Sequence, residues 1–244
     1  MKIIVNGAGG RMGKALRAMI DSGCRGAALA AAVDPYVQEE GVLSSLEQFY
    51  AGADCIIDFS NHAGTGGLLD YAMSKNLPVV IATTGHTEAE LAAIRAAAQR
   101  VPVFHSGNMS LGIAVLTQLV RKAAMMFPDA DVEIVESHHN QKLDVPSGTA
   151  LMLAHAVQDA RPESNLLVGR HENGKRTRQE IGIHSLRMGN TVGIHEVIIN
   201  TGTQILTLKH EAQDRSLFAE GALAAAAFII GKAPGLYNMD DIVE

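Results

Sequence analysis

The feature that most constrains this chain is a glycine cluster that directly follows a short apolar run at the N-terminus. Residues 2–5 read Lys-Ile-Ile-Val and predict a buried strand of a parallel sheet. Residues 7–13 then read Gly-Ala-Gly-Gly-Arg-Met-Gly, and apolar residues recur at three- and four-residue intervals from position 11 to about 22. This recurrence predicts an amphipathic helix. A strand, a glycine turn and a helix in this order let the backbone approach a bound anion closely.

The glycine spacing and one carboxylate together predict a dinucleotide site. Gly7, Gly10 and Gly13 fit the spacing G-x-x-G-x-x-G rather than the usual G-x-G-x-x-G. Asp34 ends a second predicted strand over residues 28–33, where a carboxylate can accept hydrogen bonds from the adenosine ribose hydroxyls. The alternative is a tight turn and a solvated Asp34. No Lys or Arg stands at positions 35–38 to receive a 2′-phosphate, so NADH is at least as good a candidate as NADPH.

Further strands are predicted at 54–59, 78–83 and 101–105, and a helix at 87–100 with a Thr87 and Glu90 capping box. This alternation of strands and helices predicts a doubly wound α/β fold. The segments that follow two of these strands, 82–85 and 106–109, are expected to face the same crevice and to line the nicotinamide side. Without the glycine cluster, both would be taken as ordinary turns.

The pattern changes near residue 108. A helix is predicted at 111–126, a strand with one polar face at 131–138 and a helix at 147–159. Three strands in series, at 181–188, 192–200 and 205–211, suggest an antiparallel sheet. An alanine-rich helix over 214–230 is placed to pack back on the first domain. We therefore expect one domain over 1–109, completed by 218–244, and a second over 110–217.

The second domain contains a cluster of proton-carrying side chains beside a helix start. His138 can supply a proton near neutral pH, and Lys142 can supply a positive charge or a second proton. The helix opened by Ser147, Gly148 and Thr149 suits a substrate carboxylate, so we expect a small anionic substrate. The alternative is a solvated strand end, a surface lysine and a plain N-cap. Glu136 shares a strand face with His138, but spacing fixes no third ligand, and no metal is predicted.

Composition excludes several classes of function. The 244 residues carry a formal charge of −6, which disfavours nucleic acid as a partner. No apolar stretch reaches 18 residues and no signal peptide is recognisable, so no membrane association is expected and a cytoplasmic location fits the two cysteines best. A semialdehyde dehydrogenase needs a cysteine nucleophile in its catalytic domain, and neither Cys24 nor Cys55 lies there. A dinucleotide sensor without activity would not need His138 and Lys142.

Residues 133–150, E-I-V-E-S-H-H-N-Q-K-L-D-V-P-S-G-T-A, resemble the signature of the dihydrodipicolinate reductase family of diaminopimelate and lysine biosynthesis. The resemblance extends over nearly the whole chain through G-A-G-G-R-M-G, A-T-T-G and S-G-N-M-S. It implies an enzyme that uses NADH and/or NADPH to reduce 4-hydroxy-tetrahydrodipicolinate to tetrahydrodipicolinate, by hydride transfer to ring C4 and protonation. It also implies an N-terminal Rossmann-like domain, an α+β substrate and oligomerisation domain with a mixed sheet, and a homotetramer.

The resemblance also implies roles for individual residues. His138 and Lys142 match the family's proton donors. The positions that bind the substrate and its carboxylates match His139, Lys142, Gly148 and Thr149. The positions that match the dinucleotide site are Gly7, Ala8, Gly9, Gly10, Arg11, Met12, Asp34, Ala82, Thr83, Thr84, Ser106, Gly107, Asn108 and Met109. The chain departs from many members at Pro35, where they carry Arg or Lys, and at Asn140 and Gln141, which replace basic residues.

Overall fold

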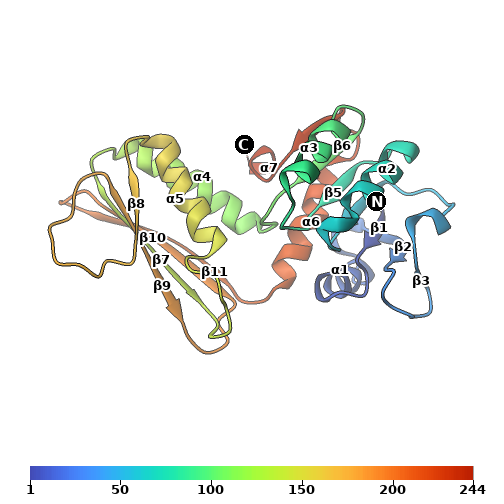
Figure 1. The fold of residues 1–244 in the computed structure, drawn as a ribbon, viewed down its shortest axis with the longest axis horizontal. Helices are drawn as coiled ribbons and strands as arrows, with labels where there is room; N and C mark the ends of the chain where they lie inside the picture. The colour runs from blue at the N-terminus through green and yellow to red at the C-terminus, as the bar shows by residue number, and fades with distance from the viewer. Residues whose placement is uncertain (244) are drawn as a thin grey trace. The chain divides into compact units, whose positions relative to one another are not determined.

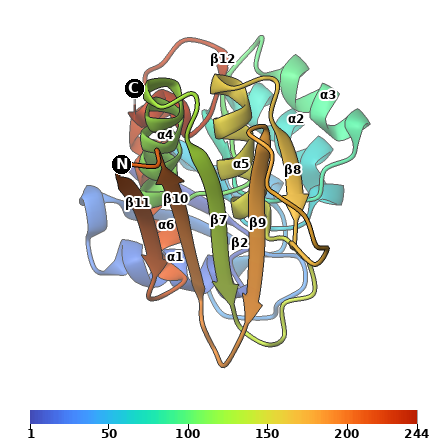
Figure 2. The same cartoon turned by 90° about the vertical axis from the view of Figure 1, so that its left-hand side faces the viewer.

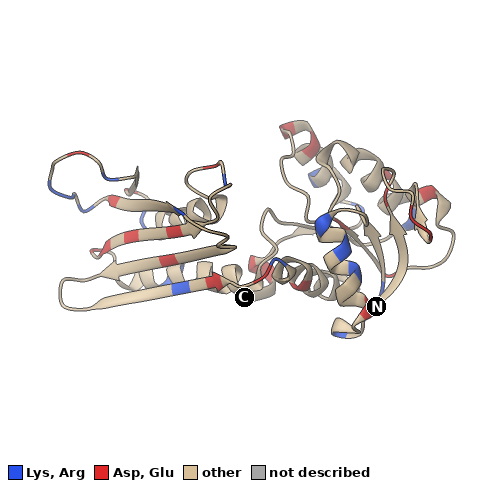
Figure 3. Cartoon of the chain, turned by 90° about the horizontal axis from the view of Figure 1, so that it is seen from below, with Lys and Arg blue, Asp and Glu red and all other residues tan. Residues whose placement is uncertain are grey.

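The computed structural model describes residues 1–243, and the chain divides into two compact units (Figure 1). Unit 1 comprises Met1–Leu111 and Arg215–Ile242, and unit 2 comprises Gly112–Asp214. Basic and acidic residues are interspersed along both units (Figure 3). Within the described chain, each helix falls short of the length and apolar character that crossing a bilayer requires.

Unit 1 contains a seven-stranded sheet in which every pair of neighbouring strands is parallel. Its strands are β1 (Lys2–Asn6), β2 (Ala28–Val33), β3 (Val42–Leu43), β4 (Cys55–Asp58), β5 (Val79–Ile81), β6 (Pro102–His105) and β12 (Gly235–Tyr237). The strand order is β12-β6-β5-β4-β1-β2-β3. Because β1 pairs with both β2 and β4, the order reverses there, and the carboxyl ends of these strands form the crevice in which such sheets bind ligands.

The helices of unit 1 follow the predicted alternation with the strands. They are α1 (Arg11–Asp21), α2 (Thr65–Lys75), α3 (Glu88–Ala97) and α6 (Ser216–Ile229), with short 3₁₀ turns η1 (Cys24–Gly26), η2 (Leu46–Gln48) and η3 (His62–Gly64). The short helix α7 (Asp240–Val243) ends the described chain. The predicted capping box at the start of α3 is confirmed, since Thr87 and Glu90 bond each other's backbone N–H groups.

The alanine-rich helix α6 packs against α1 and against the sheet of unit 1. Gly221 permits a close approach: an added Cβ would lie 1.6 Å from the carbonyl oxygen of Met109. The side chains of Ala222, Leu223 and Ile229 are fully buried. A segment from the end of the chain thus supports the segment that follows β6.

Unit 2 contains a five-stranded sheet with helices on one face only (Figure 2). Its strands are β7 (Asp131–His138), β8 (Asn165–Val168), β9 (Glu180–Arg187), β10 (Gly193–Asn200) and β11 (Ile205–Ala212), and its helices are α4 (Leu111–Met126) and α5 (Gly148–Ala160). Period-two alternation directs Val132 and Ile134 of β7 into the core, where Leu153 and Val157 of α5 also lie. The same alternation places Glu136 and His138 on this face, beyond the apolar core.

The expectation of an antiparallel sheet is wrong for two of the four described strand pairs in the sheet of unit 2. β10 runs antiparallel to β7 and β11, but β9 runs parallel to β7 and to β8. The physical reason is the connection from β7 to β9, which includes α5 and β8 and so returns the chain in the same direction. The mixed sheet implied by the family resemblance is confirmed.

The elements that the sequence did not reveal are short or weakly patterned. They are the strands β3, β8 and β12, of two to four residues, the four-residue helix α7, the 3₁₀ turns, and helix α2, which begins with Thr-Gly-Gly. Short strands lack the length over which alternation becomes visible. The helices and strands that the sequence predicted agree with the structure to within about three residues at their ends.

Candidate active site

The glycine turn of unit 1 is packed so closely that larger residues do not fit. Gly7 has a φ of +77°, and an added Cβ there would lie 2.6 Å from the carbonyl oxygen of Phe59. An added Cβ at Gly13 would lie 2.1 Å from the carbonyl oxygen of Gly7. Helix α1 then begins after Gly10, which has no side chain with which to cap it. The N–H groups of its first turn are therefore available to an anion.

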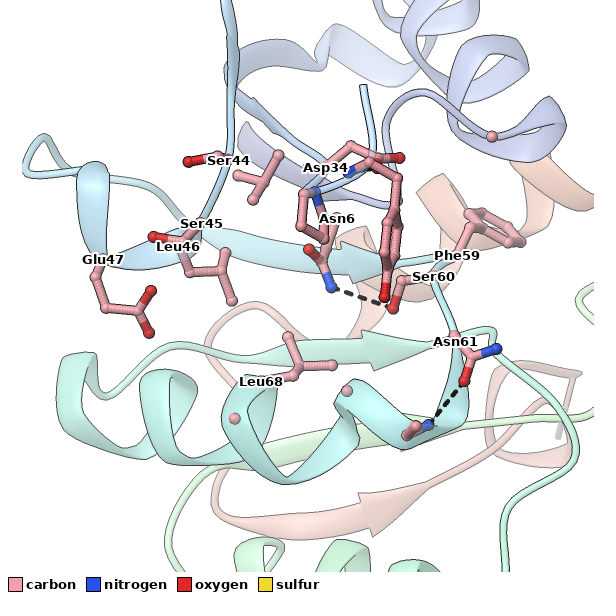
Figure 4. A pocket seen from close by; sticks show the side chains of 18 residues that line it. Asn6, Asp34, Ser44, Ser45, Leu46, Glu47, Phe59, Ser60, Asn61 and Leu68 are labelled. Atoms are coloured by element: carbon pink, nitrogen blue, oxygen red, sulfur yellow. Dashed lines mark hydrogen bonds between the residues drawn. The ribbon is translucent and has the colours of Figure 1, made fainter. Parts of the chain in front are cut away.

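Asp34, at the end of β2, is joined to the glycine turn. Its Oδ2 accepts a hydrogen bond from the Gly9 N–H at 3.0 Å, and its Oδ1 accepts one from the Tyr36 N–H at 2.9 Å. Asp34 borders a pocket of about 670 Å³ that extends from the glycine turn to η2 and η3 (Figure 4). Among the described residues, the charged side chains lining this pocket are Asp34 and Glu47. The pocket is therefore acidic on the side where a ribose would meet Asp34.

A second carboxylate, Asp58, fixes three strand ends at the same edge of the sheet. Its Oδ1 accepts hydrogen bonds from Asn6 Nδ2 at 2.8 Å and Ser60 Oγ at 2.6 Å. Its Oδ2 accepts one from Thr83 Oγ1 at 2.7 Å. Asp58 is almost completely buried, so these bonds stabilise a carboxylate that would otherwise be costly to desolvate. Sequence reasoning predicted Thr83 but missed Asp58, Asn6 and Ser60.

The remaining predicted cofactor residues lie in unit 1 around the same sheet edge. Ala82 and Thr84 follow β5, and Ser106 to Met109 follow the neighbouring strand β6. Ser106 Oγ donates to the Asn108 carbonyl oxygen at 2.8 Å and accepts from the Asn108 N–H at 3.2 Å, which closes this turn on itself. At the start of α1, Arg11 is exposed and Met12 is half-buried.

In unit 2, the predicted proton donor His138 ends β7 and contacts a buried carboxylate. The exposed fraction of His138 is 9%, and its Nδ1 lies 2.6 Å from Glu136 Oε2. Arg187 of β9 donates to both oxygens of Glu136, with both distances 2.8 Å. Strand pairing accounts for this arrangement, because His138 and Arg187 are direct neighbours in the β7–β9 register.

The pKa values of Glu136 and His138 are each set by two opposing effects, burial and hydrogen bonding. Burial raises the pKa of Glu136, but hydrogen bonds from Arg187 and His138 outweigh burial and bring that pKa to about 2. Burial lowers the pKa of His138, and the Glu136 carboxylate opposes this effect. Glu136 therefore stays ionised at neutral pH.

Glu136 also bonds the start of helix α5. Its Oε1 accepts a hydrogen bond from the Ser147 N–H at 3.1 Å, and Ser147 Oγ accepts from the Ala150 N–H as the N-cap of α5. The same hydroxyl lies 3.1 Å from Nε2 of His195, whose ring meets that of His138 edge-to-face at 5.1 Å between centroids. Burial, with repulsion from His138, lowers the pKa of His195 to about 4, so this ring is neutral at pH 7.

The other predicted substrate residues lie in the loop and helix start that follow β7. Lys142 Nζ lies 2.8 Å from an Asp144 carboxylate oxygen, and the Asp144 carbonyl oxygen accepts from Arg187 at 2.7 Å. His139 is half-buried directly after β7. Gly148, exposed, and Thr149, half-buried, are the first two residues of α5. The ion pair and the Arg187 hydrogen bond thus connect Lys142 to the Glu136 carboxylate.

Sequence reasoning noted Glu136 on the His138 face but tested it only as a metal ligand, and it missed Arg187 and His195. These two residues lie about 50 positions from His138 in the sequence, and only the register of β9 and β10 brings them to it. The period-two pattern of β7 was the available signal for Glu136, because residues two apart on a strand share a face.

Comparison with known proteins gives concordant results. A family model described as "Dihydrodipicolinate reductase, N-terminus" matches residues 1–109, and one described as "Dihydrodipicolinate reductase, C-terminus" matches residues 112–243. Proteins named 4-hydroxy-tetrahydrodipicolinate reductase from Caldanaerobacter subterraneus and Clostridium novyi are 43% and 40% identical to this chain, covering 100% of it and 98% of each relative. A structure described as dipicolinate-bound dihydrodipicolinate reductase from Paenisporosarcina sp. TG-14 has a TM-score of 0.84 at 24% identity, covering 99% of both chains.

The fold and these matches define an NAD(P)H-dependent oxidoreductase with a Rossmann-like domain. The chain belongs to the dihydrodipicolinate reductase family. It catalyses an NAD(P)H-dependent reduction in diaminopimelate and lysine biosynthesis.

Proposed function

We propose that this chain reduces 4-hydroxy-tetrahydrodipicolinate to tetrahydrodipicolinate, with His138 as the proton donor and Lys142 assisting it. The observation that carries these roles is the buried network in unit 2. There a single carboxylate, Glu136, holds both His138 and the start of α5. Glu136 thus fixes the position of the acid relative to a helix N-terminus that can bind an anion. This arrangement suits a reaction on a small anionic ring, because the acid must reach a substrate that is anchored by its carboxylates.

Unit 1 has the features that a nicotinamide dinucleotide requires. The glycine turn leaves no space for side chains, and α1 starts without a side-chain cap, which suits a pyrophosphate. Asp34 borders the adjacent pocket and suits the adenosine ribose. Residues 82–84 and 106–109 would hold the nicotinamide end. When bound, NADH or NADPH would supply the hydride that adds to ring C4 of the substrate, after or with loss of the C4 hydroxyl as water.

The substrate's carboxylates would bind at the start of α5 and beside the histidine pair. Gly148 and Thr149 stand in the first turn of α5, where N–H groups and the positive end of the helix dipole favour anions. His139 and Lys142 would add polar contacts. A dicarboxylate ring is the class of substrate that uses two such anion sites at once.

The chain's own residues account for the proton. Since His138 Nδ1 faces the ionised Glu136, its Nε2 is the atom that remains to deliver a proton to the ring carbon made electron-rich by hydride addition. The Lys142 ammonium, paired with Asp144, contributes a fixed positive charge on the same loop. General acid catalysis of this kind contributes about 10²- to 10⁴-fold to a rate.

We also propose a cytoplasmic homotetramer. The face of the unit 2 sheet that carries no helix presents apolar side chains at alternate positions of several strands, namely Val135, Leu186, Ile194, Ile198 and Ile205. A second copy would shield this face from water, since sheets with one uncovered apolar face pack against another layer. Both cysteines are free, which suits a reducing compartment. Sedimentation or mass photometry of the purified chain tests the assembly.

A coupled assay tests the proposed reaction. The synthase product made from pyruvate and aspartate semialdehyde is added with NADH or NADPH, and absorbance at 340 nm is followed. We expect cofactor oxidation that falls about 10³-fold in His138→Gln with little change in KM. His171→Gln is the matched control, because His171 is an exposed loop histidine. Unchanged turnover in His138→Gln would remove its acid role, and cofactor binding without oxidation would favour a dinucleotide sensor.

A further inference from the structure

We propose that Glu136 is a positioning residue of this reaction, which sets the tautomer of His138 and ties it to the substrate-binding start of α5. This inference rests on the proposed role of His138 as the acid. Glu136 is completely buried and receives four hydrogen bonds, from His138 Nδ1, the Ser147 N–H and two Arg187 nitrogens. No other carboxylate among residues 1–243 both contacts His138 and bonds the α5 N-terminus.

The two oxygens of Glu136 face different parts of the site. Oε2 receives His138 Nδ1 at 2.6 Å, and Oε1 receives the Ser147 N–H at 3.1 Å. A carboxylate can only accept, so His138 must keep a proton on Nδ1 in both of its protonation states. The proton that leaves the ring is then always the Nε2 proton. An amide at position 136 would present one acceptor and one donor and would not impose this choice.

Among the described charged side chains that act on His138, Glu136 is the one with a negative charge. Arg187 faces it from β9, His195 from β10 and Lys142 from the loop after β7, while Gly193 of β10 lies beside its Nε2. An added Cβ at Gly193 would lie 3.1 Å from His138 Nε2. The absence of a side chain at Gly193 keeps this ring edge accessible, as delivery of a proton from Nε2 requires.

A merely structural role for Glu136 is the competing explanation. A buried carboxylate could serve only to neutralise Arg187, in which case removing both charges together would restore the site. The two roles differ in what the double substitution Glu136→Gln with Arg187→Met does. It leaves no unpaired buried charge, but it removes the acceptor that fixes His138 Nδ1–H.

We expect the double variant to fold and to lose about 10²-fold in kcat, with the KM for the dicarboxylate changing less than about threefold. The alkaline limb of the kcat profile should move to lower pH by about one unit, because the loss of the anion outweighs the loss of the more weakly acting Arg187 cation. Glu163→Gln is the control: Glu163 is exposed in the turn after α5, away from the helix-free face of the sheet. Its kcat and pH profile should be unchanged.

A direct readout comes from nitrogen-15 spectra of histidine-labelled enzyme above pH 8. In the wild type, neutral His138 should carry its proton on Nδ1, and in the double variant a population with the proton on Nε2 should appear. These spectra do not depend on turnover. Turnover of His138→Gln separates this inference from the proposed function: if that variant is fully active, the proposed acid role fails, whatever the tautomer of the wild type.

Three results would overturn the positioning role. The first is a kcat within twofold of wild type in the double variant, with His138→Gln inactive. The second is an Nε2–H tautomer of His138 in the wild type. The third is a loss of kcat with an unshifted pH profile and an unchanged tautomer, which would assign Glu136 to structure alone.

Discussion

The two units of this chain prepare their sites by opposite means. Unit 1 does so by leaving side chains out: at Gly7, Gly9 and Gly13, an added Cβ would lie within 2.6 Å of a neighbouring atom. Unit 2 places charged side chains in its interior, where Glu136 and Arg187 pair beside two histidines. Unit 1 should therefore be sensitive to a single added methyl group, whereas unit 2 should be sensitive to the loss of a charge at constant volume.

Among the tests of this contrast, we expect the largest change in activity from Lys142→Met, which removes the charge of the side chain and keeps its length. We expect kcat to fall about 10²-fold while the melting temperature stays within about two degrees, because the Lys142–Asp144 pair is partly exposed on the Asp144 side and solvent-accessible pairs contribute little to stability. Lys122→Met, at an exposed position of α4, is the control. A similar loss in both variants would mean that the charge of Lys142 has no specific role.

Gly13→Ala tests unit 1 by adding one methyl group. Because the new Cβ would lie 2.1 Å from the Gly7 carbonyl oxygen, the turn must shift, and we expect a loss of about 3 kcal/mol in the free energy of unfolding with weaker NADH binding. Gly66→Ala, in helix α2 with open space around it, should instead stabilise the chain by up to about 1 kcal/mol. Urea titration and fluorescence binding of NADH measure both. Equal effects would contradict the packing argument.

His195 should make the free energy of unfolding of unit 2 depend on pH, whereas the glycine turn of unit 1, residues 7–13, contains no such buried histidine. The pKa of His195 is lowered to about 4 from its ordinary 6.5, so as pH falls between these values the unfolded chain binds the proton first. Stability should therefore decrease as pH falls from 6.5 to 4, with a slope of up to about 1.4 kcal/mol per pH unit. His195→Gln should flatten this slope. Denaturant unfolding at several pH values measures it, and an equally steep slope in the variant would assign the dependence elsewhere.

The smallest expected effect concerns the cofactor. Asp34 and Glu47 make the pocket beside the glycine turn acidic, and Arg17 is paired with Glu39, so a 2′-phosphate would find repulsion there. We expect NADH to be favoured over NADPH by about tenfold in kcat/KM. Tyr36→Arg, at an exposed position of the pocket lining, should narrow this ratio, with Tyr50→Arg as the control. A preference for NADPH in the wild type would contradict this interpretation.

The contrast between the units also explains what could be predicted from the sequence. The glycine turn and Asp34 depend on local geometry and spacing, and the strands and helix around them were predicted near their observed bounds. His138 and its loop formed a compact segment of the sequence. Arg187 and His195, however, reach His138 only through the pairing of β9 and β10 with β7, and one sequence does not specify that register. The parallel direction of β9 was missed for the same reason.

The packing of α6 against α1 has a consequence for the order in which the nascent chain can fold. All of unit 2, residues 112–214, leaves the ribosome before α6 and β12, which complete the core and edge of unit 1. Residues 112–214 are thus a continuous insertion whose sequence is available before α6, while α1 waits for a packing partner made about 195 residues later. During synthesis, unit 2 can therefore be complete before unit 1, although its residues come second in the chain.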